Sequence, residues 1–136
     1  MMLHQARTIS MAQMARNQVI SPQVKDLAAR IEAEQSPQTQ QMSALLTQWG
    51  IPAPATTGGT GAIGATGNGQ MPRTVSGAAF DRMFLQTMTV HDQRTVDMSQ
   101  TELAQGTNPA TRTLAQQIIS IHQAQISEMQ ALLQVI

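Results

Sequence analysis

The sequence predicts an all-α protein, a four-helix bundle made of two similar helical hairpins. Three observations lead to this prediction: an internal repeat, a helix-period apolar pattern in each repeat, and a long linker rich in Gly, Pro and Thr between them. The chain has 136 residues, which is the size of one domain. We expect repeat one at 1–49, the linker at 50–75 and repeat two at 76–136.

The internal repeat aligns residues 1–46 with residues 88–133 at a constant shift of 87 and without a gap. Of the 46 aligned pairs, 16 are identical, and His4/His91 and Met11/Met98 are among them. The two halves are therefore expected to fold as the same supersecondary unit. The segment between them holds seven of the nine Gly residues and shows no apolar period, which is typical of a flexible linker.

Each repeat divides where a capping-type residue precedes a proline, at Ser21-Pro22 and at Asn108-Pro109. This dipeptide favours a helix start, because proline is suited to the first helical position. Pro37 lies inside the second helix, where it either opens the bundle through a kink or only curves the helix around the core. Four helices are predicted, at about 1–19, 22–48, 77–105 and 109–135.

The second helix of each hairpin carries apolar residues at alternating steps of four and three, the spacing of a bundle seam. The seam reads Val, Ala, Ile, Gln, Gln, Met, Leu, Trp from position 24 to 49, and Thr, Ala, Ile, His, Gln, Met, Leu, Ile from 111 to 136. Both seams become polar midway, and counting from the hairpin turns places the polar positions at one height. The predicted central cluster consists of His4, Gln35, Gln38, His91, His122 and Gln125.

The charge balance of eight basic against eight acidic residues provides no strong field for a nucleic acid or an anionic membrane, so both partners are disfavoured. No stretch approaches the roughly 20 apolar residues that span a bilayer, and no signal-peptide pattern is present. The chain has no Cys, which excludes disulfides and thiolate metal sites. It is instead rich in Met, with ten.

The third helix is expected to begin about ten residues before Met88, whereas its repeat partner Met1 is the first residue. We therefore expect a truncated N-terminus and apolar surface left uncovered beside the first helix, with a homodimer or an exchange of helices as a consequence. The linker, if extended, exceeds the length of a helix, so up-down and crossover topologies are both open.

The spacing of the His and Met residues suggests a soft metal site. In Met1-x-x-His4-(x6)-Met11 and its repeat Met88-x-x-His91-(x6)-Met98, steps of three and seven place all three side chains on one helix face. Imidazole and thioether ligands suit Cu(I) and Ag(I). The alternative is structural: Met fills a core poor in aromatic residues, while His and Gln form a buried layer that sets the register.

Enzyme signatures are weak, and we expect no enzyme. A di-iron bundle needs Glu-x-x-His motifs, and the sequence contains none. A Gly-x-Gly-x-x-Gly match at 59–64 lies in low-complexity sequence without a preceding strand. Asp92 follows His91 but points about 100° away on a helix, which disfavours a catalytic pair of these two residues.

A longer pattern covers nearly the whole chain: Phe-x-x-x-Phe-Leu-x-x-Met-x-x-His-x-x-x-x-Val-x-Met from 80 to 98, then Leu-Ala-x-x-Ile-(x10)-Met-x-x-Leu-Leu from 114 to 133, with partial copies in repeat one. It resembles bacterial domain-of-unknown-function family 305. The resemblance implies a ferritin-like four-helix bundle, usually exported to the periplasm or cell surface. Some members resemble copper-binding, copper-resistance proteins that use Met and His ligands.

This chain differs from the family pattern at the site. The second residue of the family's His-His pair is Gln5 in one repeat and Asp92 in the other, and the family's Glu on the second arm is Gln38 or Gln125. The resulting hypothesis is a non-enzymatic, extracytoplasmic protein that binds Cu(I) or Ag(I) for sequestration or resistance; the alternative is a metal-free structural or interaction bundle. The candidate ligands are His4, His91 and His122, with Met1, Met11, Met88 and Met98.

Overall fold

A computed structural model describes residues 1–18, 21–52 and 77–136, and this part of the chain forms four helices and no strand. They are α1 (Met2–Gln18), α2 (Pro22–Gln48), α3 (Ala78–Gln105) and α4 (Pro109–Val135). The all-α bundle is thereby confirmed, and each helix boundary agrees with the predicted one to within one residue. All but the first three residues of the expected linker, and the whole Gly-rich motif at 59–64, lie outside the described residues.

The two hairpins begin their second helices with the same Pro but use different caps. Asn108 accepts a hydrogen bond from the Thr111 backbone N–H at 3.1 Å, which satisfies a free donor in the first turn of α4. Ser21, at the matching position before α2, donates its hydroxyl to Gln23 at 2.8 Å. Its backbone N–H donates to the Asp81 carboxylate at 2.8 Å, so the start of α2 is tied to α3.

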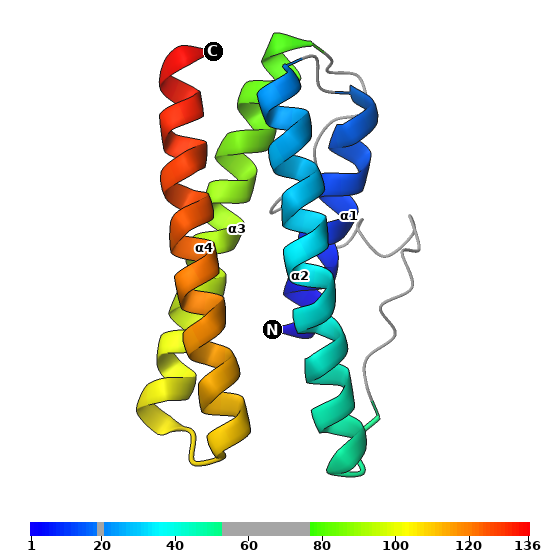
Figure 1. Cartoon of the computed structure of the whole chain (residues 1–136), viewed down its shortest axis with the longest axis vertical. Coiled ribbons are helices and arrows are strands. Elements are labelled where there is room, and N and C mark those ends of the chain that lie inside the picture. The colour runs from blue at the N-terminus through cyan, green and yellow to red at the C-terminus, as the bar shows by residue number, and fades with distance from the viewer. Residues whose placement is uncertain (19–20, 53–76) are drawn as a thin grey trace.

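Each helix packs against two others: α1 lies beside α2 and α3, and α4 lies beside α3 and α2. Figure 1 shows that α1 and α4 run one way and α2 and α3 the other, so every neighbouring pair is antiparallel. The end of α2 and the start of α3 lie at opposite ends of the bundle. Of the two topologies that the sequence left open, the structure has the crossover.

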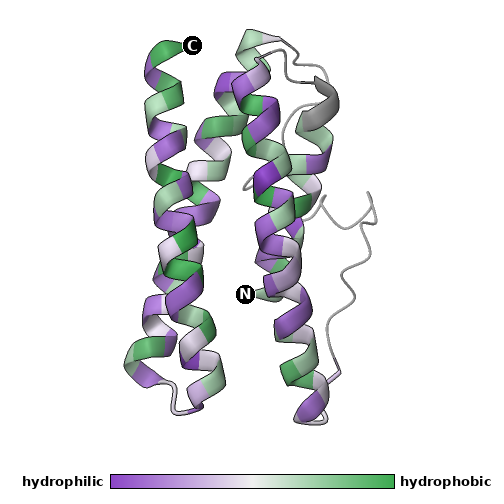
Figure 2. Ribbon diagram, in the orientation of Figure 1, coloured by the Kyte–Doolittle hydropathy of each residue, from purple (hydrophilic) through white to green (hydrophobic). Residues whose placement is uncertain are grey.

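The apolar core occupies the end of the bundle where α1 finishes and α3 begins. Polar and apolar residues alternate along all four helices, as expected when each helix buries one face (Figure 2). Pro37 is exposed, and α2 continues through it. The buried apolar cluster consists of Met11, Ala12, Ala15, Val24, Leu27, Ala28, Ile31, Phe80, Phe84, Leu85, Met88 and Met129.

In the part of the chain that the structure describes, the opposite end of the bundle is formed by three helices, because α1 is short. With 17 residues α1 is about 26 Å long, whereas α2, with 27, is about 40 Å long. The N-terminus consequently lies part-way along the bundle, short of its lower end (Figure 1). A groove of about 610 Å³ opens below it, lined by residues from all four helices. None of the described helices is long and apolar enough to cross a membrane.

Candidate functional site

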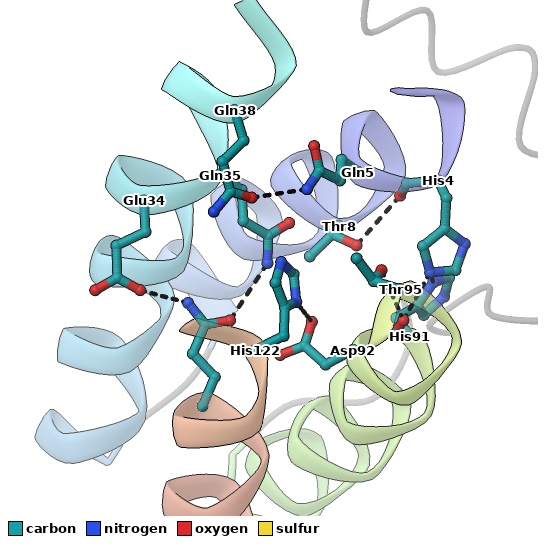
Figure 3. Close-up of polar contacts among 11 residues, drawn as sticks. His4, Gln5, Thr8, Glu34, Gln35, Gln38, His91, Asp92, Thr95 and His122 are labelled. Carbon is teal, nitrogen blue, oxygen red and sulfur yellow. Dashed lines mark hydrogen bonds and ion pairs between the residues drawn. The ribbon is translucent and has the colours of Figure 1, made fainter. Parts of the chain in front are cut away.

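A layer of buried polar side chains crosses the middle of the bundle, next to the apolar core (Figure 3). Burying such groups costs free energy unless they find hydrogen-bond partners, so their contacts define what the layer does. It draws on all four helices. Its buried members are Gln5, Thr8, Gln35, Gln38, His91, Asp92, Thr95, Ser99, His122 and Gln125, and the half-buried His4 lies at its edge.

His4 and His91, which the repeat aligns, meet between α1 and α3 (Figure 3). Their ring centroids are 4.6 Å apart. His4 Nε2 lies 3.3 Å from His91 Nδ1 and 2.7 Å from the His91 backbone carbonyl oxygen. A single proton on His4 Nε2 can serve both of these acceptors. If that proton leaves, two imidazole lone pairs and a carbonyl oxygen face the same point.

The environment of this histidine pair favours neutral rings. Burial lowers the pKa of His91 to about 4, and the nearby charges of His4, Arg94 and Arg7 add to the shift. Burial also lowers the pKa of His4, although its hydrogen bond to the His91 carbonyl acts in the opposite direction. Neutral imidazole is the form that ligates metals, so the pair is available as a ligand at neutral pH.

His122 is part of a second, deeper pair. Its Nδ1 lies 3.1 Å from Asp92 Oδ1, and both side chains are completely buried. This contact does not have the geometry of a good hydrogen bond. Within the described residues, the two carboxylate oxygens of Asp92 and the two ring nitrogens of His122 all lack a hydrogen-bond partner. Burial raises the pKa of Asp92, while His122 and Gln35 partly offset that rise. The structure therefore places His122 beside Asp92, apart from the His4–His91 pair (Figure 3).

The glutamines of the layer link the helices of the bundle. Gln5 donates to Gln38 Oε1 at 2.8 Å, which joins α1 to α2. Gln35 donates to Gln125 Oε1 at 3.4 Å, and Gln125 in turn donates to the exposed Glu34 carboxylate, which joins α2 to α4. The Gln5–Gln38 contact lies within the first hairpin, and the contacts of Gln125 join the two hairpins. The layer therefore sets the relative height of the helices.

The four candidate methionines divide into two groups on either side of the layer. Met11 and Met88 belong to the apolar core cluster. Met1 and Met98 line the groove at the other end of the bundle, together with Met42. The predicted ligands therefore do not converge on one point. The structure brings His4 and His91 into contact. The thioethers of Met11 and Met88 lie on the core side of this pair, and those of Met1 and Met98 lie on the groove side.

The predicted central cluster did not include Gln5 and Asp92, which belong to the buried layer. Both lie one position after a seam histidine and both are completely buried. The missed signal is a second stripe on α3, which runs through Asp81, Leu85, Met88, Asp92 and Ser99. A helix with two neighbours in a bundle buries a face wider than one seam, so adjacent positions are buried as well.

In the described part of the chain, no group of three or more His, Asp or Glu residues could hold a metal ion. The donors that do come together are the two imidazoles of His4 and His91, with thioethers one and two helical turns away at Met1 and Met98. This donor set is soft, and it fits a Cu(I)-type ion far better than a cation that needs carboxylates.

Comparisons with known proteins agree with this fold. The family model of a domain of unknown function, DUF305, matches residues 1–133. A DUF305 fragment from Deinococcus radiodurans is 26% identical, with a TM-score of 0.83, and the alignment covers 100% of this chain and 91% of that one. The chain matches none of the curated proteins with which it was compared.

Two further similar structures are of the protein CopM. Its Cu(II)-bound form is 29% identical with a TM-score of 0.82, and its Cu(I)-bound form is 27% identical with a TM-score of 0.76. Each alignment covers 98% of this chain and 90% of CopM. CopM has also been seen in an Ag-bound form. With a family match over almost its whole length and the same four-helix architecture, this chain belongs to the DUF305 family.

Proposed function

We propose that this protein binds Cu(I) or Ag(I) through the His4–His91 pair, in a non-enzymatic role of metal sequestration or resistance. The single observation that carries the proposal is the 3.3 Å separation of His4 Nε2 and His91 Nδ1. Metal–imidazole bonds are about 2.0–2.1 Å long in zinc sites, so nitrogens at this separation subtend an angle near the tetrahedral value at a shared ion. The ion would replace the proton that the two rings share.

The thioethers complete the proposed donor set. Met1 immediately precedes α1, three residues before His4, and Met98 is two turns from His91 on α3; both line the groove, so they lie on the groove side of the pair. Thioether sulfur favours Cu(I) and Ag(I) over harder cations. Met11 and Met88 are assigned a packing role, because they are buried in the apolar cluster. The copper-bound and silver-bound forms of CopM support the choice of copper or silver as the metal.

We place this function outside the cytoplasm, as the family resemblance implies. The test of location is an antibody or reporter assay on the cell fractions of the native organism. Recovery with the periplasmic or secreted fraction is expected, and recovery in the cytoplasm alone contradicts this part of the proposal without affecting the metal site.

The metal site is tested by titrating the metal-free protein with Cu(I) against a competing chelator. The variant His4→Gln/His91→Gln is expected to lose the stoichiometric high-affinity step. His122→Gln is the matched control: it changes a buried histidine of the same layer to the residue that repeat one carries at the aligned position, Gln35. Binding is expected to persist in this control. Circular dichroism of each variant verifies that the bundle remains folded.

A second titration assigns the sulfur ligands. Met1→Leu/Met98→Leu is expected to weaken Cu(I) binding by about tenfold or more, because a soft ligand is removed while apolar volume is kept. Met11→Leu/Met88→Leu is expected to leave the affinity unchanged. If the double-His variant binds as tightly as the wild type, the proposed site is wrong.

The alternative function is a metal-free structural or interaction bundle. The specific observation that favours it is the pair of contacts Gln5–Gln38 and Gln35–Gln125. These hydrogen bonds explain the burial of four glutamines by a purely structural role, because they fix the register of the helices. On this view neither the wild type nor any variant takes up Cu(I) in competition with a chelator, while the variants of the layer still lower the thermal stability.

A further inference from the structure

Four unpartnered polar atoms lie together between α3 and α4, inside the polar layer. They are both carboxylate oxygens of Asp92 and both ring nitrogens of His122, and no hydrogen bond within the described residues satisfies any of them. Both side chains are completely buried, and Asp92 Oδ1 lies 3.1 Å from His122 Nδ1 (Figure 3). Buried polar groups of native proteins nearly always have a partner, so this pair implies a bound species that serves both side chains.

The repeat provides an internal comparison for these two positions. A shift of 87 aligns Asp92 with Gln5 and His122 with Gln35. Gln5 and Gln35 each donate a hydrogen bond to another glutamine, at 2.8 Å and 3.4 Å. At the same two positions repeat two has a carboxylate and an imidazole, which are both ligands of metal cations. The change to metal-ligating side chains and the loss of hydrogen-bond partners therefore occur together.

The geometry of the contact favours a shared cation over a direct hydrogen bond. In a hydrogen bond the proton lies close to the line between donor and acceptor, and the Asp92–His122 contact does not meet this condition. Two ligands of one cation instead meet at an angle. With metal–ligand bonds of about 2.1 Å, atoms 3.1 Å apart subtend about 95° at the metal. An angle of this size is compatible with four- to six-coordinate sites.

The donor atoms select the class of cation. No third His, Asp or Glu joins Asp92 and His122 within the described residues, so a further protein donor has to be of another type. Gln35 approaches Asp92 closely enough to lower the pKa of that carboxyl, and Gln35 Oε1 has no partner in the described part of the chain. Imidazole suits Zn²⁺ and related transition metals, whereas oxygen ligands alone suit Mg²⁺ and Ca²⁺. The mixed nitrogen and oxygen set, without sulfur, fits the Zn²⁺ class.

We propose that Asp92 and His122, together with the amide oxygen of Gln35, bind a divalent transition-metal cation of the Zn²⁺ class inside the bundle. This site is separate from the His4–His91 pair and takes a harder ion, so the inference goes beyond the proposed Cu(I) binding. The cation offsets the buried charge of Asp92 and gives both side chains the partner that they lack. It also joins α2, α3 and α4, so the metal-bound protein is more stable than the metal-free one.

The test measures Zn²⁺ binding by the refolded protein. Both side chains are inaccessible in the folded bundle, so the metal-free chain is unfolded in urea and refolded with Zn²⁺ and a competing chromophoric chelator. We expect one Zn²⁺ per chain, and a higher midpoint of thermal unfolding than that of the metal-free protein. The chain has no Cys and only three His, so few other residues compete for the ion.

Variants of the two main ligands locate the ion. Asp92→Asn and His122→Gln are each expected to weaken Zn²⁺ binding at least about 100-fold, because loss of an outer-shell partner alone costs roughly 10–100-fold. His4→Gln/His91→Gln is the matched control: it leaves His122 as the one histidine and should bind Zn²⁺ as the wild type does. In the Cu(I) titration the expected order of these variants is reversed, so failure of one site is distinguishable from failure of the other.

Two outcomes would overturn the proposal. One is the absence of stoichiometric Zn²⁺ uptake by the refolded wild type, which would leave internal water as the partner of the four atoms. The other is Zn²⁺ binding that neither ligand variant weakens, which would indicate adventitious binding at the surface. If a single variant fails to fold, Asp92→Gln/His122→Gln replaces it, because this double variant has the residues of repeat one at both positions.

Discussion

At the scale of single residues, His91 and Asp92, which are neighbours on α3, have opposite pH behaviour. His91 has a folded pKa near 4, below the ordinary value of 6.5, because burial penalises its charged form. Asp92 has a folded pKa above its ordinary value of 3.8 for the same reason. His91 therefore destabilises the fold as the pH falls, whereas Asp92 destabilises it as the pH rises through the folded pKa of that carboxyl.

The pH dependence of His91 yields a test on the metal-free protein. Between pH 6.5 and pH 4 the unfolded chain binds a proton at position 91 that the folded chain does not, so stability decreases as the pH falls through this window. His91→Gln removes this group and should flatten the decrease. The measurement is the free energy of unfolding by urea at several pH values. Parallel curves for the wild type and the variant across the window would contradict the assignment.

At the scale of helices, the starts of α2 and α4, at Ser21-Pro22 and Asn108-Pro109, are capped in different ways. Asn108 caps α4 with its side chain, whereas the Ser21 hydroxyl is directed to Gln23 and the Ser21 backbone to Asp81. The positions are equivalent in the repeat, so they form a matched pair in which one side chain stabilises its helix and the other does not.

Asn108→Ala is expected to lower the free energy of unfolding by about 1 kcal/mol, because the Thr111 N–H loses its acceptor. Ser21→Ala is the control and is expected to cost less than about 0.5 kcal/mol, since its backbone contact to Asp81 is retained. Urea denaturation of both variants measures the difference. Equal losses would show that the cap of α4 is not the stabilising contact.

At the scale of the whole molecule, the crossover sets a minimum length for the connection between α2 and α3. The two helix ends lie at opposite ends of a bundle about 40 Å long (Figure 1). At 3.3–3.6 Å per residue, a connection needs roughly 12 residues to cover this distance. An up-down bundle would need only a short turn there.

Replacing residues 53–76 with about 15 Gly and Ser residues should therefore preserve a folded monomer, whereas about two should not, because the retained residues 49–52 and 77 then leave the connection well short of the required length. With the shorter linker, the hairpins can pair only with those of another chain, so we expect swapped dimers or loss of helix. Light scattering combined with circular dichroism distinguishes these results. A stable, fully helical monomer with the two-residue linker would rule out the crossover.

Much of the candidate site was predictable, and the remainder has a specific cause. The 4-3 spacing placed His4, His91 and His122 in one layer, because helical geometry fixes which face a residue occupies. The partner of each side chain did not follow from spacing. His122 pairs with Asp92 although the sequence neighbour of Asp92 is His91, since the contact forms across two helices and depends on how they rotate against each other.

The sequence by itself determined the four helices, their boundaries and the two hairpins, because capping residues, prolines and apolar periodicity act locally along the chain. Only the tertiary structure decided the crossover, the division of the methionines between core and groove, and the meeting of His4 with His91. These features depend on the packing of helices from different hairpins. Many arrangements of such helices satisfy the same local pattern, and side-chain packing selects one of them.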